Sequence, residues 1–298
     1  MGINKKNISV VLFCYILWGI LPVYWNLLSE VNSLFILCCR IVFSIFFTVG
    51  VLVVTGRLKM LRDIFRDKAA IRYLIPTSLL ITFNWGLYIW AVNAGRVLDC
   101  SLGYYMNPLM AFVLGVLIFR EKFKKLQVVA VILALTGVLI SFVAFGSFPF
   151  VSIGLATSFA VYGVFKKKAG VDPVAGIAVE AMLVAPFAII VSFVFLGDSV
   201  RAVSLTDFLL LFGGGAATAI PLVLYSSSVN HLPLNIVGFF QYISPSLTLV
   251  YGLLIGEEPS MAQIVSFVFI GLGLIVFSVA IVLISRAEKK QLLISSRS

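Results

Sequence analysis

Charged and metal-binding residues are scarce in this chain, and their scarcity excludes several classes of protein. Only 11% of the 298 residues are charged, 61% are hydrophobic, and the mean hydropathy is +1.14. A soluble domain could not cover its surface with so few polar groups. There is one histidine, and the four cysteines show no zinc-binding spacing. Because an enzyme needs converging acids, bases or metal ligands, we expect no catalytic residues, no metal and no cofactor.

Long apolar segments make up most of the chain. Each is about 20 residues long, the length with which a helix crosses the hydrocarbon of a bilayer. A β-barrel would show short segments of alternating polarity instead. The first segment is too long for a cleavable signal peptide and has no obvious cleavage site. The sequence therefore predicts an all-α membrane protein with ten transmembrane helices, at 8–28, 33–55, 72–94, 98–119, 126–145, 150–168, 173–196, 206–229, 234–256 and 262–285.

One stretch of the chain occurs twice. Residues 88–121 align without gaps on residues 225–258 with ten identities, whereas roughly three would be expected by chance between apolar segments of this length. The duplication divides the chain into two five-helix halves, 1–147 and 148–298. Because five is an odd number, the halves enter the membrane from opposite sides. Inverted repeats are typical of alternating-access transporters, and they make a monomer sufficient, with a dimer left open.

The basic residues lie mostly on one side of the predicted topology. With both termini in the cytoplasm, cytoplasmic segments hold most of the 22 Lys and Arg residues, and outer segments hold only Arg96 and Arg201. Cytoplasmic loops of membrane proteins carry this excess of positive charge. The net charge of +10 therefore indicates a multi-pass topology in the plasma membrane rather than nucleic-acid binding. The repeat agrees, since the basic neighbours of Glu121 are missing around its copy, Glu258.

Two ionisable residues lie deep inside predicted spans, where charged side chains are costly and usually functional. Arg40 and Glu180 each come seven residues after the start of their span, in equivalent spans of the two halves. Each then lies roughly 10 Å below its own membrane surface, so the two flank the midplane. We predict a charge pair that binds or gates the solute, with Glu180 as a proton site. The alternatives are a structural ion pair between the halves, or an Arg40 satisfied by helix-end carbonyls.

Proline interrupts two equivalent spans. Pro108 follows Asn107, and Pro245 is the copy of Pro108. Each proline removes a helix hydrogen bond and frees a carbonyl group. Paired interruptions in matching spans point to a central site or gate, and the alternative is that they only shape the bundle. Polar side chains beside these prolines are predicted to line the cavity: Tyr104, Tyr105, Asn107, Gln241 and Tyr242.

Aromatic residues lie near the middle of the third and eighth spans. Asn84, Trp85 and Tyr88 belong to the third span, and Tyr225 is the copy of Tyr88. Aromatic rings bind organic cations through their faces and stack on apolar metabolites. These residues are therefore candidates for solute contact, and ordinary helix packing is the alternative.

Aromatic residues beside glycines mark the first and sixth spans. Trp18 and Tyr162 are approximate counterparts, each directly before a glycine, and Tyr24 follows the first of them. Glycine permits a close approach or a hinge, so we predict a cavity wall or gate here. Glu121 and Glu258 lie at span ends, where they more simply form hydrogen bonds that hold a turn.

Several strings of this sequence are similar to one known family. They are residues 17–25 (LWGILPVYW), 40–44 (RIVFS), 104–109 (YYMNPL) and 240–245 (FQYISP). Over nearly its whole length the chain resembles the RarD branch, the chloramphenicol-sensitive proteins, of the EamA-type drug/metabolite transporters. The resemblance implies a ten-helix inner-membrane permease whose central cavity opens alternately to each side, in a superfamily that exports amino acids, other metabolites or drugs. Cys39 departs from the branch, which usually has His there, and Phe43 stands where Trp is frequent.

Together these observations predict a secondary transporter. It would move small organic metabolites, amino acids among them, across the plasma membrane by alternating access, as an exporter. Its partners would be a small-molecule substrate and the lipid bilayer. The rival interpretations are a multidrug or chloramphenicol-type efflux protein, a membrane enzyme acting on lipid-linked substrates, and a scaffold, which explains the repeat poorly.

Overall fold

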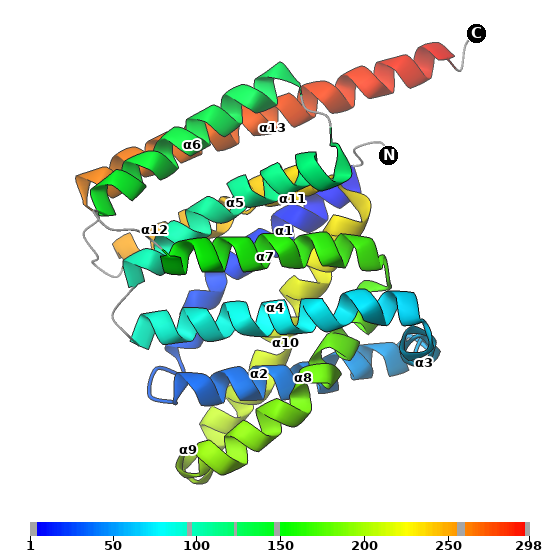
Figure 1. Ribbon diagram of the computed structural model, residues 1–298, viewed down its shortest axis with the longest axis vertical. Coiled ribbons are helices and arrows are strands. Elements are labelled where there is room, and N and C mark those ends of the chain that lie inside the picture. The colour runs from blue at the N-terminus through cyan, green and yellow to red at the C-terminus, as the bar shows by residue number, and fades with distance from the viewer. Residues whose placement is uncertain (1–4, 94–96, 122–123, 146–149, 255–259, 296–298) are drawn as a thin grey trace.

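The computed structural model describes residues 5–93, 97–121, 124–145, 150–254 and 260–295, and over these residues it contains helices and no strands (Figure 1). The helices are α1 (Lys5–Asn26), α2 (Ser33–Val54), α3 (Lys59–Arg66), α4 (Lys68–Asn93), α5 (Val97–Phe119), α6 (Lys125–Phe145), α7 (Phe150–Ala169), α8 (Pro173–Phe195), α9 (Gly197–Ala202), α10 (Leu205–His231), α11 (Leu234–Phe240), α12 (Ile243–Leu254) and α13 (Met261–Ser295).

Long apolar helices coincide with the predicted spans. In the described part of the chain, seven helices are long and apolar enough to cross a membrane, namely α1, α2, α4, α6, α8, α10 and α13. Helix α5 contains a shorter apolar stretch, Gly103–Phe119. Helix α7 carries three lysines in its last turn, which lower its hydropathy. The predicted span 234–256 is not one helix, because it is divided into α11 and α12, each too short to cross a bilayer alone.

Polar side chains at the helix starts explain where several of these helices begin. Asn32 caps α2 by accepting hydrogen bonds from the backbone N–H groups of its first turn. Asp172 does the same for α8, whose first residue is Pro173. Ser204 and Asp207 form a reciprocal capping box at the start of α10. These are the residue types that satisfy the free N–H groups of a helix start.

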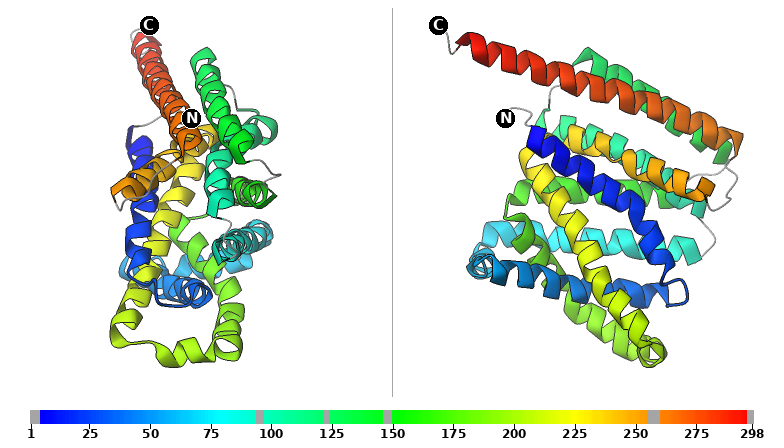
Figure 2. Two further views of the ribbon diagram at one scale, coloured as in Figure 1. Left: turned by 90° about the vertical axis from the view of Figure 1, so that its left-hand side faces the viewer. Right: turned by 180° about the vertical axis from the view of Figure 1, so that it is seen from behind.

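The helix contacts repeat between the two halves of the chain. Three contacts join equivalent spans, which are α2 with α8, α5 with α11, and α6 with α13. Other extensive contacts form matched sets: α4–α7 with α10–α1, α5–α7 with α12–α1, and α2–α10 with α8–α4. Figure 2 shows α6 and α13 side by side at one end of the molecule. A pseudo-two-fold relation between the two halves would produce such matched contacts.

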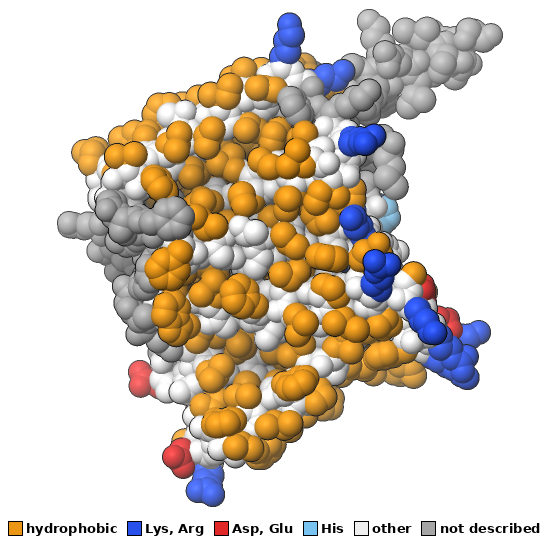
Figure 3. Space-filling view, in the orientation of Figure 1, with side chains coloured by type: hydrophobic (Ala, Val, Ile, Leu, Met, Phe, Trp, Pro, Cys, Tyr) orange, Lys and Arg blue, Asp and Glu red, His pale blue; other side chains and the backbone are white. Residues whose placement is uncertain are grey.

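The surface is apolar except at its edges. Hydrophobic side chains cover the face seen in Figure 3, and Lys and Arg gather along the edge where α3 and the end of α7 lie. Val54, Val143 and Phe195 are among the most exposed side chains, at 87%, 77% and 74%. An apolar surface of this extent is expected against lipid rather than water.

Candidate functional site

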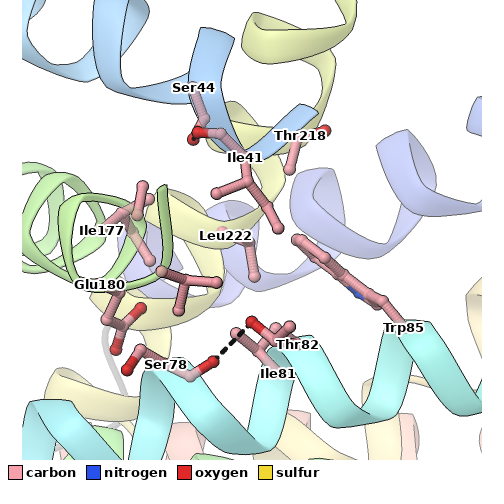
Figure 4. Close-up of a pocket in the computed structure, with 12 residues that line it drawn as sticks. Ile41, Ser44, Ser78, Ile81, Thr82, Trp85, Ile177, Glu180, Thr218 and Leu222 are labelled. Carbon is pink, nitrogen blue, oxygen red and sulfur yellow. Dashed lines mark hydrogen bonds between the residues drawn. The ribbon is translucent and has the colours of Figure 1, made fainter. Parts of the chain in front are cut away.

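A small cavity lies between α2, α4, α8 and α10, and Figure 4 shows the side chains that converge on it. Its volume is about 30 Å³. That is room for about one or two water molecules, whereas sites for organic ligands usually measure roughly 300–1,000 Å³. The lining residues are Ile41, Ser44, Ser78, Ile81, Thr82, Trp85, Ile177, Glu180, Ala181, Val184, Thr218 and Leu222.

Repeat-equivalent positions line this cavity. Helices α2 and α8 begin at Ser33 and Pro173, an offset of 140 residues (173 − 33). The sequence repeat that relates α4 to α10 has an offset of 137 residues (225 − 88). These offsets pair Ile41 with Ala181, Ser44 with Val184, Ile81 with Thr218, and Trp85 with Leu222. Four pairs of equivalent positions from the two halves therefore contribute to the cavity wall.

Arg40 lies beside the cavity and shares two residues with its wall. Its Nε donates a hydrogen bond to Thr218 Oγ1 at 2.9 Å. Its guanidinium carbon is 4.5 Å from the ring centroid of Trp25 and 4.5 Å from that of Trp85. The guanidinium therefore forms a cation–π contact with each of the two indole rings. No ion pair involves Arg40 among the side chains that the structure describes.

Glu180 lines the cavity and is neutralised within its own half of the chain. Its Oε1 accepts a hydrogen bond from Lys166 Nζ at 3.0 Å, and the Tyr162 hydroxyl lies 3.4 Å from Oε2. The side chains of Lys166 and Glu180 are 1% and 5% exposed. Arg40 and Glu180 are therefore not paired with each other, so the structure contains neither the predicted charge pair nor the alternative structural ion pair between them. Sequence reasoning did not predict this contact of Lys166, which lies in the last turn of α7.

Aromatic side chains form a cluster next to Glu180. The rings of Tyr162 and Tyr225 are stacked with centroids 5.8 Å apart and planes 17° apart. Trp18 lies 5.8 Å from Tyr225 and 5.8 Å from Phe159. Tyr225 is 2% exposed, and a Cβ atom added at Gly163 would collide with its hydroxyl group. The structure thus brings together Trp18, Tyr162 and Tyr225, three residues predicted from sequence, as a tightly packed cluster.

Other residues that were predicted to contact the solute form contacts between helices instead. The Asn84 amide donates to Leu155 O and Ser158 Oγ, each at 2.8 Å, and so links α4 to α7. The Tyr24 hydroxyl donates to Leu210 O at 2.5 Å, and the Tyr105 ring packs edge-on against Phe267. None of the three predicted residues lines the cavity. Tyr88 is 37% exposed, packs against Tyr104, and lies near enough to Arg40 for an electrostatic interaction.

The two prolines behave differently. Helix α5 continues through Pro108 without a break, so the predicted interruption is wrong there. The chain does break before Pro245, at Gln241 and Tyr242, which separate α11 from α12. Gln241 and Tyr242 are buried, as is Asn107, and none of the three lines the cavity. The Oδ1 atom of Asn107 and the Tyr242 hydroxyl have no hydrogen-bond partner among the described residues.

Comparison with known proteins identifies the family. The EamA-like transporter family matches residues 5–143 and residues 148–279. The chain belongs to this family. A solved crystal structure of another protein shares the fold, with a TM-score of 0.73 at 15% sequence identity over 92% of this chain and 97% of that one.

Relatives place this EamA-like protein in the RarD branch. The uncharacterized transporter YojE of Bacillus subtilis is 39% identical over 294 residues, 96% of this chain and 98% of the relative. Protein RarD of Escherichia coli is 35% identical over 291 residues, with the same coverage of 96% and 98%. Chloramphenicol-sensitive protein RarD of Pseudomonas aeruginosa is 31% identical over 264 residues, 86% of this chain and 88% of the relative. The resemblance inferred from the sequence is confirmed, and the chain is a multi-pass membrane transporter.

Sequence reasoning did not predict the hydroxyl groups that line the cavity between α2, α4, α8 and α10. Ser78, Thr82 and Trp85 follow each other at helical spacing on α4 and line the cavity together. Ser78 and Thr82 donate to carbonyls of their own helix at 2.8 Å, so their hydrogen atoms are satisfied while lone pairs stay available. The i, i+4, i+7 spacing of polar residues in an apolar span was a signal that could have found this face.

Glu121 holds a turn, as predicted. Its carboxylate accepts hydrogen bonds from the backbone N–H groups of Leu234 at 2.6 Å and Asn235 at 2.9 Å, at the start of α11. It also accepts one from Lys167 Nζ at 2.7 Å. A carboxylate at a helix N-terminus is favourable because it meets free N–H groups and the positive end of the helix dipole. Its copy, Glu258, lies outside the described residues.

Proposed function

We propose that this EamA-like protein is a secondary transporter that moves small organic metabolites across the plasma membrane by alternating access. The observation that carries the proposal is the cavity between α2, α4, α8 and α10, whose wall contains equivalent positions of both halves. Transporters built from inverted repeats bind solute at the interface of the repeats, near the bilayer midplane. In the present conformation this cavity holds only about 30 Å³, so α2, α4, α8 and α10 must separate to admit a solute.

The proposed topology has ten spans, inverted five-helix halves and cytoplasmic termini. The matched helix contacts support two related halves, and the basic edge of the molecule supports the cytoplasmic side. In this topology α11 and α12 cross the membrane together, with the break at Gln241 and Tyr242 buried in protein. Non-helical backbone at membrane depth is tolerated where protein covers it. The fused repeat supplies both sides of the cavity, so a monomer suffices for transport.

The proposed solute site combines the cavity with Arg40 and with the ion pair of Lys166 and Glu180. Trp85 and Glu180 line the cavity, and Arg40 shares Trp85 and Thr218 with its wall. The stacked Tyr162 and Tyr225 adjoin Glu180 and act as a wall that must repack when the halves rock. We assign the break before Pro245 to this rocking motion, and the direction to export, as the superfamily resemblance implies.

Drug efflux is a second candidate function. One relative is called chloramphenicol-sensitive protein RarD, and chloramphenicol is a neutral aromatic amide alcohol whose ring would suit Trp85. The proposal of metabolite transport stays first, because Arg40 lies beside the cavity and carries a charge that a neutral drug would not use.

Reconstitution tests the proposed function. The purified protein in liposomes should take up one class among pooled labelled amino acids, organic acids and chloramphenicol, with saturation. Trp85→Ala should lower that uptake at least about tenfold, because aromatic contacts in a buried site are worth about 1–3 kcal/mol. Trp90→Ala, which removes a tryptophan that is 51% exposed on the same helix, should leave uptake unchanged. Folded protein that takes up none of these solutes would contradict transport.

A further inference from the structure

The charges beside the cavity do not cancel. The charged side chains in the cavity wall or in contact with it, among those described, are Arg40, Lys166 and Glu180. Lys166 and Glu180 neutralise each other through a 3.0 Å contact and are nearly inaccessible. Arg40 is only partly buried, and no carboxylate lies within ion-pair distance of it among the described side chains. Among the side chains that the structure describes, the proposed solute site therefore carries one positive charge without a counter-ion.

The contacts of Arg40 leave one edge of the guanidinium available. Trp25 and Trp85 cover the group by cation–π contacts, each at 4.5 Å. These rings stabilise the cation without neutralising its charge. Thr218 occupies only the Nε hydrogen, and no protein hydrogen bond to either Nη atom is present in the described part of the chain. The planar fork of Nη donors matches a carboxylate in geometry and charge.

Two tyrosines, one on α4 and one on α5, lie near the guanidinium of Arg40. Tyr88 and Tyr104 interact electrostatically with Arg40, and they are 37% and 40% exposed. Their hydroxyl groups can donate to the oxygen atoms of an anion held by Arg40. An anion held by the Nη atoms therefore need not displace Trp25 or Trp85 from their cation–π contacts with the guanidinium.

We propose that the solute is an organic monocarboxylate without a neighbouring ammonium group, and that Arg40 binds its carboxylate. The inference rests on the proposed transport function and sharpens it. An α-amino acid also needs an acceptor for its ammonium group, and Glu180, the carboxylate that lines the cavity, is already bound to Lys166. The walls offer an apolar body mostly aliphatic contacts, from residues such as Ile41, Ile81 and Leu222. Organic cations and zwitterions are disfavoured because their ammonium group would meet the positive charge of Arg40 without a free carboxylate to balance it.

Four probes that share one benzyl body separate these classes. Phenylacetate is the monocarboxylate, phenylglycine adds an α-ammonium group to it, phenylacetamide is neutral, and benzylamine is cationic. Binding to the purified full-length protein is measured by calorimetry at roughly 1 mM, the upper end of ordinary KM values. We expect phenylacetate to bind at least about tenfold more tightly than each of the others, the factor expected of one charge-assisted contact.

Variants of Arg40 connect the preference to this residue. Arg40→Gln should abolish the difference between phenylacetate and phenylacetamide, and Arg40→Lys, which keeps a point charge, should restore part of it. Arg66→Gln removes an exposed arginine at the end of α3 and should leave the ranking unchanged. A preference that survives in Arg40→Gln overturns the assignment, as does wild-type protein that binds phenylglycine or phenylacetamide as well as phenylacetate, or that does not bind phenylacetate. Each variant is compared only as monodisperse protein with cooperative thermal unfolding.

Uptake into proteoliposomes distinguishes failure of this inference from failure of the transport function. Saturable uptake of phenylglycine with no uptake of phenylacetate would retain transport and overturn the monocarboxylate assignment. Binding of phenylacetate at Arg40 with no uptake of any probe would support the anion site and contradict transport. Saturable uptake of phenylacetate that is lost in Arg40→Gln supports both.

Discussion

At the residue scale, the buried pair of Lys166 and Glu180 is the feature that most constrains the second half. Two charges out of water cost several kcal/mol unless each has a partner. Here the two side chains are 1% and 5% exposed and their charged atoms are 3.0 Å apart, with Tyr162 as a further neighbour of Glu180. The pair ties α7 to α8 beside the cavity, so any movement of the cavity wall has to carry both residues together.

Removing one member of this pair should be more harmful than removing both charges. Lys166→Met leaves Glu180 buried without a partner and should lower the free energy of unfolding by about 3–5 kcal/mol. The double variant Lys166→Met with Glu180→Gln removes the stranded charge and should recover part of that loss. Thermal unfolding in detergent measures both.

A lysine in the same turn provides the control for this prediction. Lys168 is exposed, so Lys168→Met should change the free energy of unfolding by no more than about 0.5 kcal/mol. Equal effects at Lys166 and Lys168 would refute the proposed strength of the pair, and so would additive losses in the double variant.

At the element scale, small residues set how closely helices pack. Helices α6 and α13 approach each other at Gly137 and Gly273. A Cβ atom added at Gly137 would lie 2.8 Å from Ser266 O, and one at Gly273 would lie 2.8 Å from Ala130 O. Both clashes are with backbone atoms, which cannot move aside as a flexible side chain can. Close backbone approach of this kind is a main source of helix association in membranes, where lipid removes the hydrophobic driving force.

Substitutions at two glycines of α13 distinguish the effect of packing from the effect of helix propensity. Gly273→Ala should cost about 1–3 kcal/mol because the methyl group forces α6 and α13 apart. Gly271 has no atom within 4 Å of its added Cβ, so Gly271→Ala should be neutral or stabilise the protein by up to about 1 kcal/mol. Chemical denaturation in mixed micelles compares the two variants, and an equal cost at both positions would show that packing at Gly273 is not limiting.

At the scale of the whole molecule, polar contacts join the two halves on the basic edge. Arg57 Nη1 and Asp172 Oδ2 are 2.9 Å apart, and they connect the end of α2 to the start of α8. Lys167 Nζ contacts Glu121 at 2.7 Å and also donates to Leu232 O at 3.1 Å. Both ion pairs cross from one half to the other, so opening the cavity toward this edge requires their separation.

Weakening one of these contacts should open the cavity toward the basic edge. Asp172→Asn loses the charge but keeps an oxygen atom that can cap α8. Since a partly exposed ion pair contributes about 1 kcal/mol or less, the open population should rise by up to about fivefold. The readout is maleimide labelling of Thr82→Cys, a cavity position, from the cytoplasmic side in a variant whose four native cysteines are replaced.

An aspartate outside these contacts provides the comparison. Asp63 is exposed on α3, and Asp63→Asn should leave the labelling rate unchanged. Faster labelling in both variants would indicate a general effect of surface charge on the reagent. Unchanged labelling in Asp172→Asn would refute a gating role for its contact with Arg57.

The candidate site could be predicted only in part from the sequence. Hydropathy and rarity singled out Arg40 and Glu180 as ionisable residues inside apolar spans, and the structure places Glu180 in the cavity wall and Arg40 against Thr218 of that wall. Their partners could not be read from the chain, because Thr218 is 178 residues from Arg40. The burial of Lys166 against Glu180 could not be predicted, because a lysine near a span end has the same sequence pattern whether it reaches water or a buried carboxylate.

The sequence by itself determined the helical class, the positions of the apolar helices, the duplication and the family, because hydropathy and periodicity are properties of local segments. Only the tertiary structure decided which side of each helix faces the cavity. Asn84, Trp85 and Tyr88 lie within five residues on α4, yet Asn84 bonds to α7, Trp85 lines the cavity, and Tyr88 packs on Tyr104. Each residue turns a helix by about 100°, so the helix rotation set by packing against distant segments determines which of these neighbours can meet a solute.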